Sequence, residues 1–179
     1  MNVLVIGSTA SGKSEFAEKI ACKLCKGQKL YIATMKPFDE ECYKKIEKHR
    51  KMRSKKNFET IEQQVDLHLL DSNIKSTAML ECMSNLLANE MYREDKTNKE
   101  IDKYILKGIE HLSNNFENLI VVSNNVFQNQ ILYDPFTEKF IEFIGNINNI
   151  ISRNFDVVVE IICGIPIYHK GGELLNEIY

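Results

Sequence analysis

Short apolar runs alternate with amphipathic stretches along the chain. The apolar runs are rich in β-branched residues and predict strands at 2–7, 29–34, 76–81, 118–124 and 156–163, with a weaker candidate at 58–62. Helical periodicity between them predicts helices at about 12–25, 38–53, 83–93, 99–115 and 135–153. Because strands separated by helices usually pair in parallel, this order predicts an α/β fold with a mostly parallel sheet flanked by helices.

The length and composition favour one compact domain. A chain of 179 residues with 44% hydrophobic residues is long enough to bury its own core, and no repeat or linker interrupts it. We therefore expect a single domain over 1–179. The formal net charge of −2 argues against a broadly basic nucleic-acid binder.

Neither a membrane span nor a secretory leader is expected. No apolar run approaches the roughly 18 residues that a membrane span needs. The start "MNVLVIGSTASGKS" has no basic n-region and no small-residue cleavage site. Five cysteines without framework spacing suit a reducing compartment. The expected location is the cytoplasm.

The stretch "GSTASGKS" at 7–14 matches the phosphate-loop pattern G-x-x-x-x-G-K-[ST] between a predicted strand and a predicted helix. Glycines let backbone N–H groups approach phosphate oxygens, and the helix adds its positive end. Lys13 can reach the β- and γ-phosphates, and the Ser14 hydroxyl can bind Mg²⁺. A Gly/Ser turn with a surface lysine would explain neither spacing nor placement. The predicted phosphate site consists of Gly7, Ser8, Thr9, Ala10, Ser11, Gly12, Lys13 and Ser14.

A carboxylate follows another predicted strand. Glu81 comes after the apolar run at 78–80, where the ligands of open α/β sheets collect. We interpret Glu81 as a partner of Mg²⁺ or of its water. The alternative is a carboxylate that stabilises the amino end of the following helix.

Positive charge is concentrated at 41–56, which holds eight Lys/Arg against two Glu. On a helix, His49 and Arg53 share a face with the apolar Ile46. From periodicity alone, His49 is a core residue or a nucleophile toward phosphorus, and the lysines form a solvated face. In the second case Arg50 and Arg53 would hold the departing phosphates. No arginine-rich lid is visible, which disfavours a nucleoside-monophosphate kinase.

The ordered motifs resemble a known family, the bifunctional adenosylcobinamide kinase / adenosylcobinamide-phosphate guanylyltransferases of cobalamin biosynthesis. The basic stretch "KIEKHRKMR" at 45–53 is similar to the family's R-I-x-x-H-x-x-x-R. The resemblance covers nearly the whole chain. Its other motifs are "GSTASGKS", "LYIAT" at 30–34, "DE" at 39–40, "TIE" at 60–62, "LEC" at 80–82 and "VVSNNV" at 121–126.

The resemblance implies a phosphate-loop, RecA-like fold, a homotrimer and a two-step activity that uses GTP and Mg²⁺. A nucleoside triphosphate, GTP or ATP, would phosphorylate adenosylcobinamide. His49 would then take GMP from GTP and pass it to adenosylcobinamide phosphate, giving adenosylcobinamide-GDP. Besides the phosphate loop, the family resemblance implies nucleotide contacts at Thr34, Met35, Lys36, Arg50, Lys51, Met52, Arg53, Glu62 and Glu81.

The chain departs from the family pattern after the strand at 118–124. The family's T-N-E-V-G-x-G is replaced by "SNNVFQN" at 123–129, so that Asn125 stands in place of a glutamate and two glycines are missing. Met52 and Phe58 replace a usual glycine and tryptophan. These changes touch the corrinoid side and the kinase step, and they leave two alternatives: another small-molecule kinase or a non-catalytic nucleotide-binding module. His68, His111 and His169 are interpreted as surface or structural residues.

Overall fold

The computed structural model describes residues 1–37, 40, 47, 53, 56–93, 100–125 and 133–176. One seven-stranded sheet has the strand order β3-β2-β4-β5-β1-β6-β7. Its strands are β1 (Asn2–Gly7), β2 (Lys29–Ala33), β3 (Phe58–Glu62), β4 (Thr77–Glu81), β5 (Asn118–Asn124), β6 (Val157–Ile162) and β7 (Ile165–Lys170). The helices are α1 (Lys13–Leu24), α3 (Met83–Met91), α4 (Ile101–Asn115), α5 (Pro135–Asn154) and α6 (Gly172–Asn176), with a 3₁₀ turn η1 (Leu67–Leu69).

The sheet is parallel except at one edge, so the predicted α/β architecture is confirmed. In the sheet order β3-β2-β4-β5-β1-β6, all neighbouring strands are parallel. The last strand, β7, is antiparallel to β6. The weak strand candidate at 58–62 is β3. Strand β7 was not predicted, because Pro166 interrupts its pattern. A proline is tolerated there because β7 is an edge strand, reached through a tight hairpin at Cys163 and Gly164 with positive φ angles.

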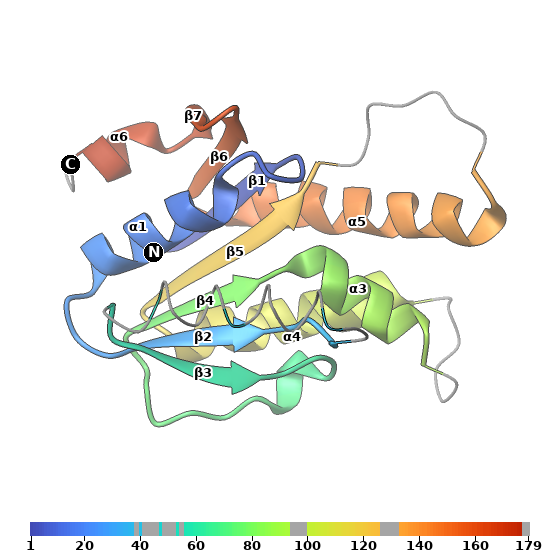
Figure 1. Cartoon of the computed structure of the whole chain (residues 1–179), viewed down its shortest axis with the longest axis horizontal. Helices are drawn as coiled ribbons and strands as arrows, with labels where there is room; N and C mark the ends of the chain where they lie inside the picture. The colour runs from blue at the N-terminus through green and yellow to red at the C-terminus, as the bar shows by residue number, and fades with distance from the viewer. Residues whose placement is uncertain are drawn as a thin grey trace.

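Two apolar layers cover the two faces of the sheet (Figure 1). On β1, Val3 and Val5 pack toward α1, whereas Leu4 packs toward the opposite layer, as the two-residue period of a strand requires. Helix α1 contributes Ala17 and Ile20 to the first cluster. Helices α3, α4 and α5 form the second, with α4 and α5 side by side behind the sheet.

The parallel register brings the ends of the strands to one edge of the sheet. Gly7 pairs with Asn124 at the ends of β1 and β5, and Ala33 pairs with both Glu62 and Glu81 at the ends of β2, β3 and β4. Loops that follow these residues therefore meet at one place, as expected for a ligand site in an open α/β sheet.

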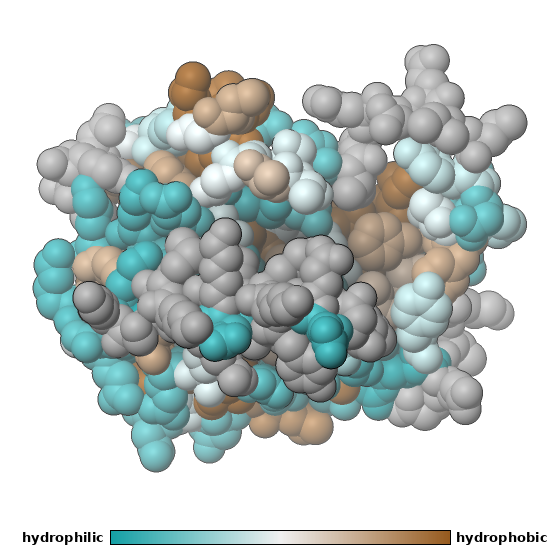
Figure 2. All heavy atoms as spheres, viewed as in Figure 1, coloured by the Kyte–Doolittle hydropathy of each residue, from teal (hydrophilic) through white to brown (hydrophobic). Residues whose placement is uncertain are grey.

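The predicted helix at 38–53 is described at three positions. Glu40, Glu47 and Arg53 are each helical, and Arg53 is buried. In the described part of the chain, no helix combines the length and apolar character that a membrane crossing needs. Figure 2 shows apolar atoms gathered at the β7 edge, where the exposed apolar side chains are Ile162, Ile165, Ile167 and Leu174.

Candidate functional site

The phosphate loop forms a compact turn between β1 and α1. Ala10 and Gly12 have positive φ angles of 59° and 93°, and the Ser11 N–H donates to the Ser8 carbonyl at 3.2 Å. A Cβ on Gly7 would lie 2.5 Å from Ser11 Oγ and 2.8 Å from the Ile161 carbonyl oxygen, so only glycine fits there. Gly12 caps α1 without a side chain, which leaves the first N–H groups of the helix available to an anion.

Lys13 is held within this loop. Its side chain is largely buried, and Nζ donates to the Ser8 carbonyl at 3.0 Å. Burial lowers the pKa of Lys13, and the nearby Glu81 carboxylate opposes that shift. The ammonium group is thus placed over the loop beside a carboxylate, as a partner for phosphate oxygens should be.

Ser14 and Glu81 are in direct contact. From the sequence, both were predicted to bind Mg²⁺, but no motif places them next to each other. The Ser14 hydroxyl donates to Oε1 of Glu81, and the Tyr31 hydroxyl donates to Oε2 at 3.0 Å. Burial raises the pKa of Tyr31, so its hydroxyl stays protonated as a donor. Both carboxylate oxygens are therefore held in place at the carboxyl end of β4.

The Arg53 guanidinium is buried and stacks on the ring of Tyr31. Its central carbon is 3.4 Å from the centroid of the Tyr31 ring, and Nη1 is 3.8 Å from the Glu18 carboxylate on α1. Lys56 also donates to Glu18, at 2.5 Å. Glu18 and Arg53 are 1% and 4% exposed, so they form a buried ionic cluster. Tyr31 links this cluster to Glu81, because its ring contacts Arg53 and its hydroxyl donates to the Glu81 carboxylate.

Thr34 uses its side chain to join the ends of two strands. Its hydroxyl donates to the Cys82 carbonyl at 2.9 Å and accepts from the Cys82 N–H at 2.8 Å, while its backbone N–H donates to the Glu81 carbonyl. Asn89 donates to the Thr34 carbonyl at 2.7 Å. Thr34 is fully buried, and its hydrogen bonds to Glu81 and Cys82 hold the end of β4, which carries Glu81, in place.

The remaining predicted contacts lie at the same edge or outside the described residues. Met35 and Lys36 follow Thr34 and are partly buried, and Glu62 ends β3 in an exposed position. The predicted nucleophile and three of the predicted nucleotide contacts lie outside the described residues: His49, Arg50, Lys51 and Met52.

Comparison with known proteins decides the family. The sequence model of the cobinamide kinase / cobinamide phosphate guanyltransferase family matches residues 3–168. The chain belongs to this family. A curated relative, the bifunctional adenosylcobalamin biosynthesis protein CobU of Escherichia coli (strain K12), is 26% identical over 185 residues, which cover 95% of this chain and 100% of that protein. The predicted family resemblance is confirmed.

One solved structure shares the fold of this family member. A DnaB-like replicative helicase superposes with a TM-score of 0.50 at 11% identity, over 88% of this chain and 46% of that one. The flagellar accessory protein FlaH of Methanocaldococcus jannaschii has a TM-score of 0.48 at 11% identity, over 94% of this chain and 77% of that one. The predicted phosphate-loop, RecA-like fold class is confirmed.

Sequence reasoning missed Tyr31 and Glu18 as members of this site. Tyr31 lies within an apolar strand and reads as a core residue, and only its hydroxyl signals a polar partner. Glu18 lies next to Ala17 on the buried side of α1. The sequence did contain one signal, a glutamate on the apolar face of the predicted helix. A carboxylate is buried only with a partner, so this position indicated a buried ion pair.

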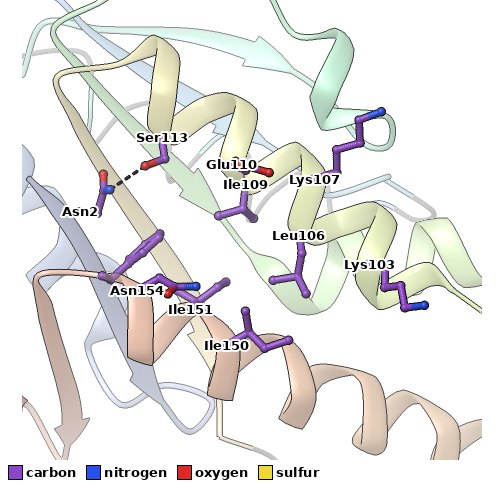
Figure 3. A pocket seen from close by; sticks show the side chains of 11 residues that line it. Asn2, Lys103, Leu106, Lys107, Ile109, Glu110, Ser113, Ile150, Ile151 and Asn154 are labelled. Atoms are coloured by element: carbon purple, nitrogen blue, oxygen red, sulfur yellow. Dashed lines mark hydrogen bonds between the residues drawn. The ribbon is translucent and has the colours of Figure 1, made fainter.

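A groove between α4 and α5 lies away from this site (Figure 3). It has a volume of about 530 Å³, and Leu106, Ile109 and Ile150 point into it. Asn2, the first residue of β1, lies at one end and donates to Ser113. The groove is therefore at the amino edge of the sheet, opposite the phosphate loop.

Proposed function

We propose that this chain is a nucleotide-dependent transferase of cobalamin biosynthesis, built as one domain, which phosphorylates adenosylcobinamide and transfers GMP from GTP to adenosylcobinamide phosphate. The observation that carries the proposal is a complete phosphate loop whose Ser14 touches Glu81, in a chain that the family model matches over 3–168. GTP, or ATP in the kinase step, is the proposed donor.

The loop geometry supports binding of a triphosphate at the amino end of α1. The N–H groups of the loop and the Lys13 ammonium would bind the phosphate oxygens and offset the charge that develops during transfer. Met35, Lys36 and Glu62 stay predicted nucleotide contacts, as do the phosphate-clamping roles of Arg50 and Arg53. In the described structure, however, Arg53 is engaged by Tyr31 and Glu18.

The Ser14 hydroxyl and the Glu81 carboxylate fit Mg²⁺. Both are hard oxygen ligands, and they lie in contact beside the phosphate loop. We propose that Ser14 holds Mg²⁺ and that Glu81 binds it directly or through a water molecule. The ion would neutralise phosphate charge when bound. Tyr31 acts as a positioning residue, because its hydroxyl fixes the second oxygen of Glu81.

His49 is the proposed nucleophile, on the family resemblance. An imidazole nitrogen of His49 attacks the α-phosphorus of GTP, an N–P bond forms, and the bond to the leaving pyrophosphate breaks. A phosphate oxygen of adenosylcobinamide phosphate then attacks the same phosphorus. The new P–O bond gives adenosylcobinamide-GDP, and cleavage of the N–P bond restores His49.

Incubation with GTP labelled at the α-phosphate tests this step. We expect acid-labile label on the wild-type protein and none on His49→Ala, because only the imidazole at 49 forms the N–P bond. His111→Ala is the matched control, since His111 contacts the Leu70 carbonyl away from the phosphate loop. Label that persists in His49→Ala would exclude His49. Transfer of γ-phosphate to another acceptor, without α-label, would favour a different kinase.

Tyr31→Phe tests the positioning of Glu81. The change removes the hydroxyl that donates to Glu81 at 3.0 Å and keeps the ring under Arg53. One charge-assisted hydrogen bond contributes about 1.5–3 kcal/mol, so we expect the Mg²⁺ concentration for half-maximal turnover to rise about tenfold or more. Magnesium titrations of GTP turnover measure this. An unchanged magnesium requirement would contradict the positioning role, whereas a change in melting temperature alone would indicate only packing.

The assembly and location of the protein complete the proposal. A homotrimer is proposed from the family resemblance, and a cytoplasmic location is proposed from the five cysteines without framework spacing, which suit a reducing compartment. The exposed apolar side chains along β6, β7 and α6 support self-association, because contiguous apolar surface favours burial against another chain.

A further inference from the structure

A second cleft at the carboxyl edge of the sheet lies next to the phosphate loop, on the face that α5 covers. Its volume is about 350 Å³, and it is lined by Ile6, Asn125, Gly145, Asn148, Asn149, Ser152 and Glu160. Asn125 connects the cleft to the phosphate loop, because its N–H donates to the Gly7 carbonyl at 3.2 Å. The register places Glu160 beside Ile6, one position before Gly7 on β1. None of the residues that line this cleft is among the proposed nucleotide contacts.

The lining of the cleft combines apolar surface with several amide and hydroxyl groups, and it carries no lysine or arginine among the described residues. Amide and hydroxyl groups offer both donors and acceptors, and the Glu160 carboxylate is the single charged group. A phosphate would meet a carboxylate with no lysine or arginine to balance it, so the cleft does not suit an anion. It suits an uncharged ligand that presents hydroxyl and amide groups.

Glu160 is held in a defined orientation. Asn125 Nδ2 donates to Oε1 of Glu160 at 2.9 Å, and His169 Nε2 lies 3.0 Å from Oε2. His169 therefore has a specific partner, which its interpretation as a plain surface or structural residue missed. Because each oxygen of a carboxylate accepts more than one hydrogen bond, both contacts leave room for a ligand hydroxyl.

A buried side chain of the cleft is incompletely satisfied. Asn148 is 7% exposed, and its Oδ1 has no hydrogen-bond partner within the described part of the chain. Its Nδ2 makes a long contact of 3.4 Å to the Asn124 carbonyl. Buried polar atoms without partners are uncommon and costly, so an unpaired amide oxygen in a cleft indicates a missing donor. An amide or hydroxyl of a ligand supplies such a donor.

We propose that this cleft binds the acceptor alcohol of the kinase step and that the Glu160 carboxylate accepts the hydrogen bond of its hydroxyl. The inference rests on the proposed function, and it names the side from which the acceptor approaches the phosphates. It also gives a reason for the altered loop after β5. Asn125 stands where the family pattern has a glutamate, and Glu160 on β6 returns a carboxylate to within 2.9 Å of the Asn125 amide.

Binding of adenosylcobinamide to Glu160→Gln tests the proposal. The change keeps the size of the side chain and removes its charge, so we expect the Kd, measured by equilibrium dialysis, and the KM of the kinase step to rise about tenfold or more. The α-label from GTP should be unchanged, since the nucleotide does not contact Glu160. Glu142→Gln is the matched control, because Glu142 is exposed on α5 outside the cleft.

A relocation of the carboxylate sharpens the test. Glu160→Leu should lose acceptor binding, and the double variant Asn125→Glu with Glu160→Leu should recover most of it, because the charge returns to the same cleft. Unchanged adenosylcobinamide affinity in both Glu160 variants would overturn the inference. Adenosylcobinamide binding that is lost in the Glu160 variants, in a protein whose wild type gives no α-label, would support this cleft as the acceptor site and count against the proposed guanylyl transfer.

Discussion

Nucleotide turnover is expected to fall about 10³-fold when Lys13 is replaced by methionine. Lys13 is largely buried, and its ammonium donates to the Ser8 carbonyl of the phosphate loop at 3.0 Å. Its charge is therefore oriented before the nucleotide arrives, and no reorganisation is needed as charge develops on the phosphates. A loss of this size corresponds to about 4 kcal/mol of transition-state stabilisation. Steady-state rates with GTP measure it for both half-reactions.

Two controls separate this effect from damage to the fold. Methionine has nearly the length of lysine and fills the same apolar path, so the melting temperature without nucleotide should change little. Lys26→Met removes an exposed charge just after α1 and should leave turnover unchanged. Full activity in Lys13→Met would show that the loop does not bind the reacting phosphates.

Glu18→Ala lowers the free energy of unfolding by about 3–5 kcal/mol, the usual cost of removing one partner from a buried ion pair. Glu18 is 1% exposed and faces Arg53, which is 4% exposed, as well as Lys56. Without this carboxylate, the Arg53 guanidinium stays buried over Tyr31 and loses the ion pair that it makes among the described residues. Urea unfolding at neutral pH measures the change, and the melting temperature should drop by roughly 10 °C.

The matched control lies one turn earlier on the same helix. Glu15 forms a solvent-exposed ion pair with Lys19, so Glu15→Ala should leave the unfolding midpoint nearly unchanged. In an Arg53→Met background, Glu18→Ala should cost much less than it does alone, because the unpaired buried charge is then absent. Equal effects of Glu15→Ala and Glu18→Ala would contradict the buried cluster.

Much of the fold was predictable because its signals are local. Each buried parallel strand is a short apolar run, and α1 follows a loop whose glycine and lysine spacing is specific. The phosphate loop at 7–14 and the strand ends that carry Thr34 and Glu81 could be located in this way. Strand β7 could not, because its exposed, proline-containing pattern makes sense only at an edge beside β6.

Spacing along the chain was enough to identify the α/β class, the phosphate loop and the family. Tertiary structure alone decided which distant side chains meet. It brought Tyr31 to Glu81, turned Arg53 toward Glu18, and set Glu160 beside Asn125. The physical reason is that strand order and register, which no local pattern encodes, determine which side chains share a strand end. Contacts at that end, rather than residue types, decide which groups hold a metal ion, a phosphate or an acceptor hydroxyl.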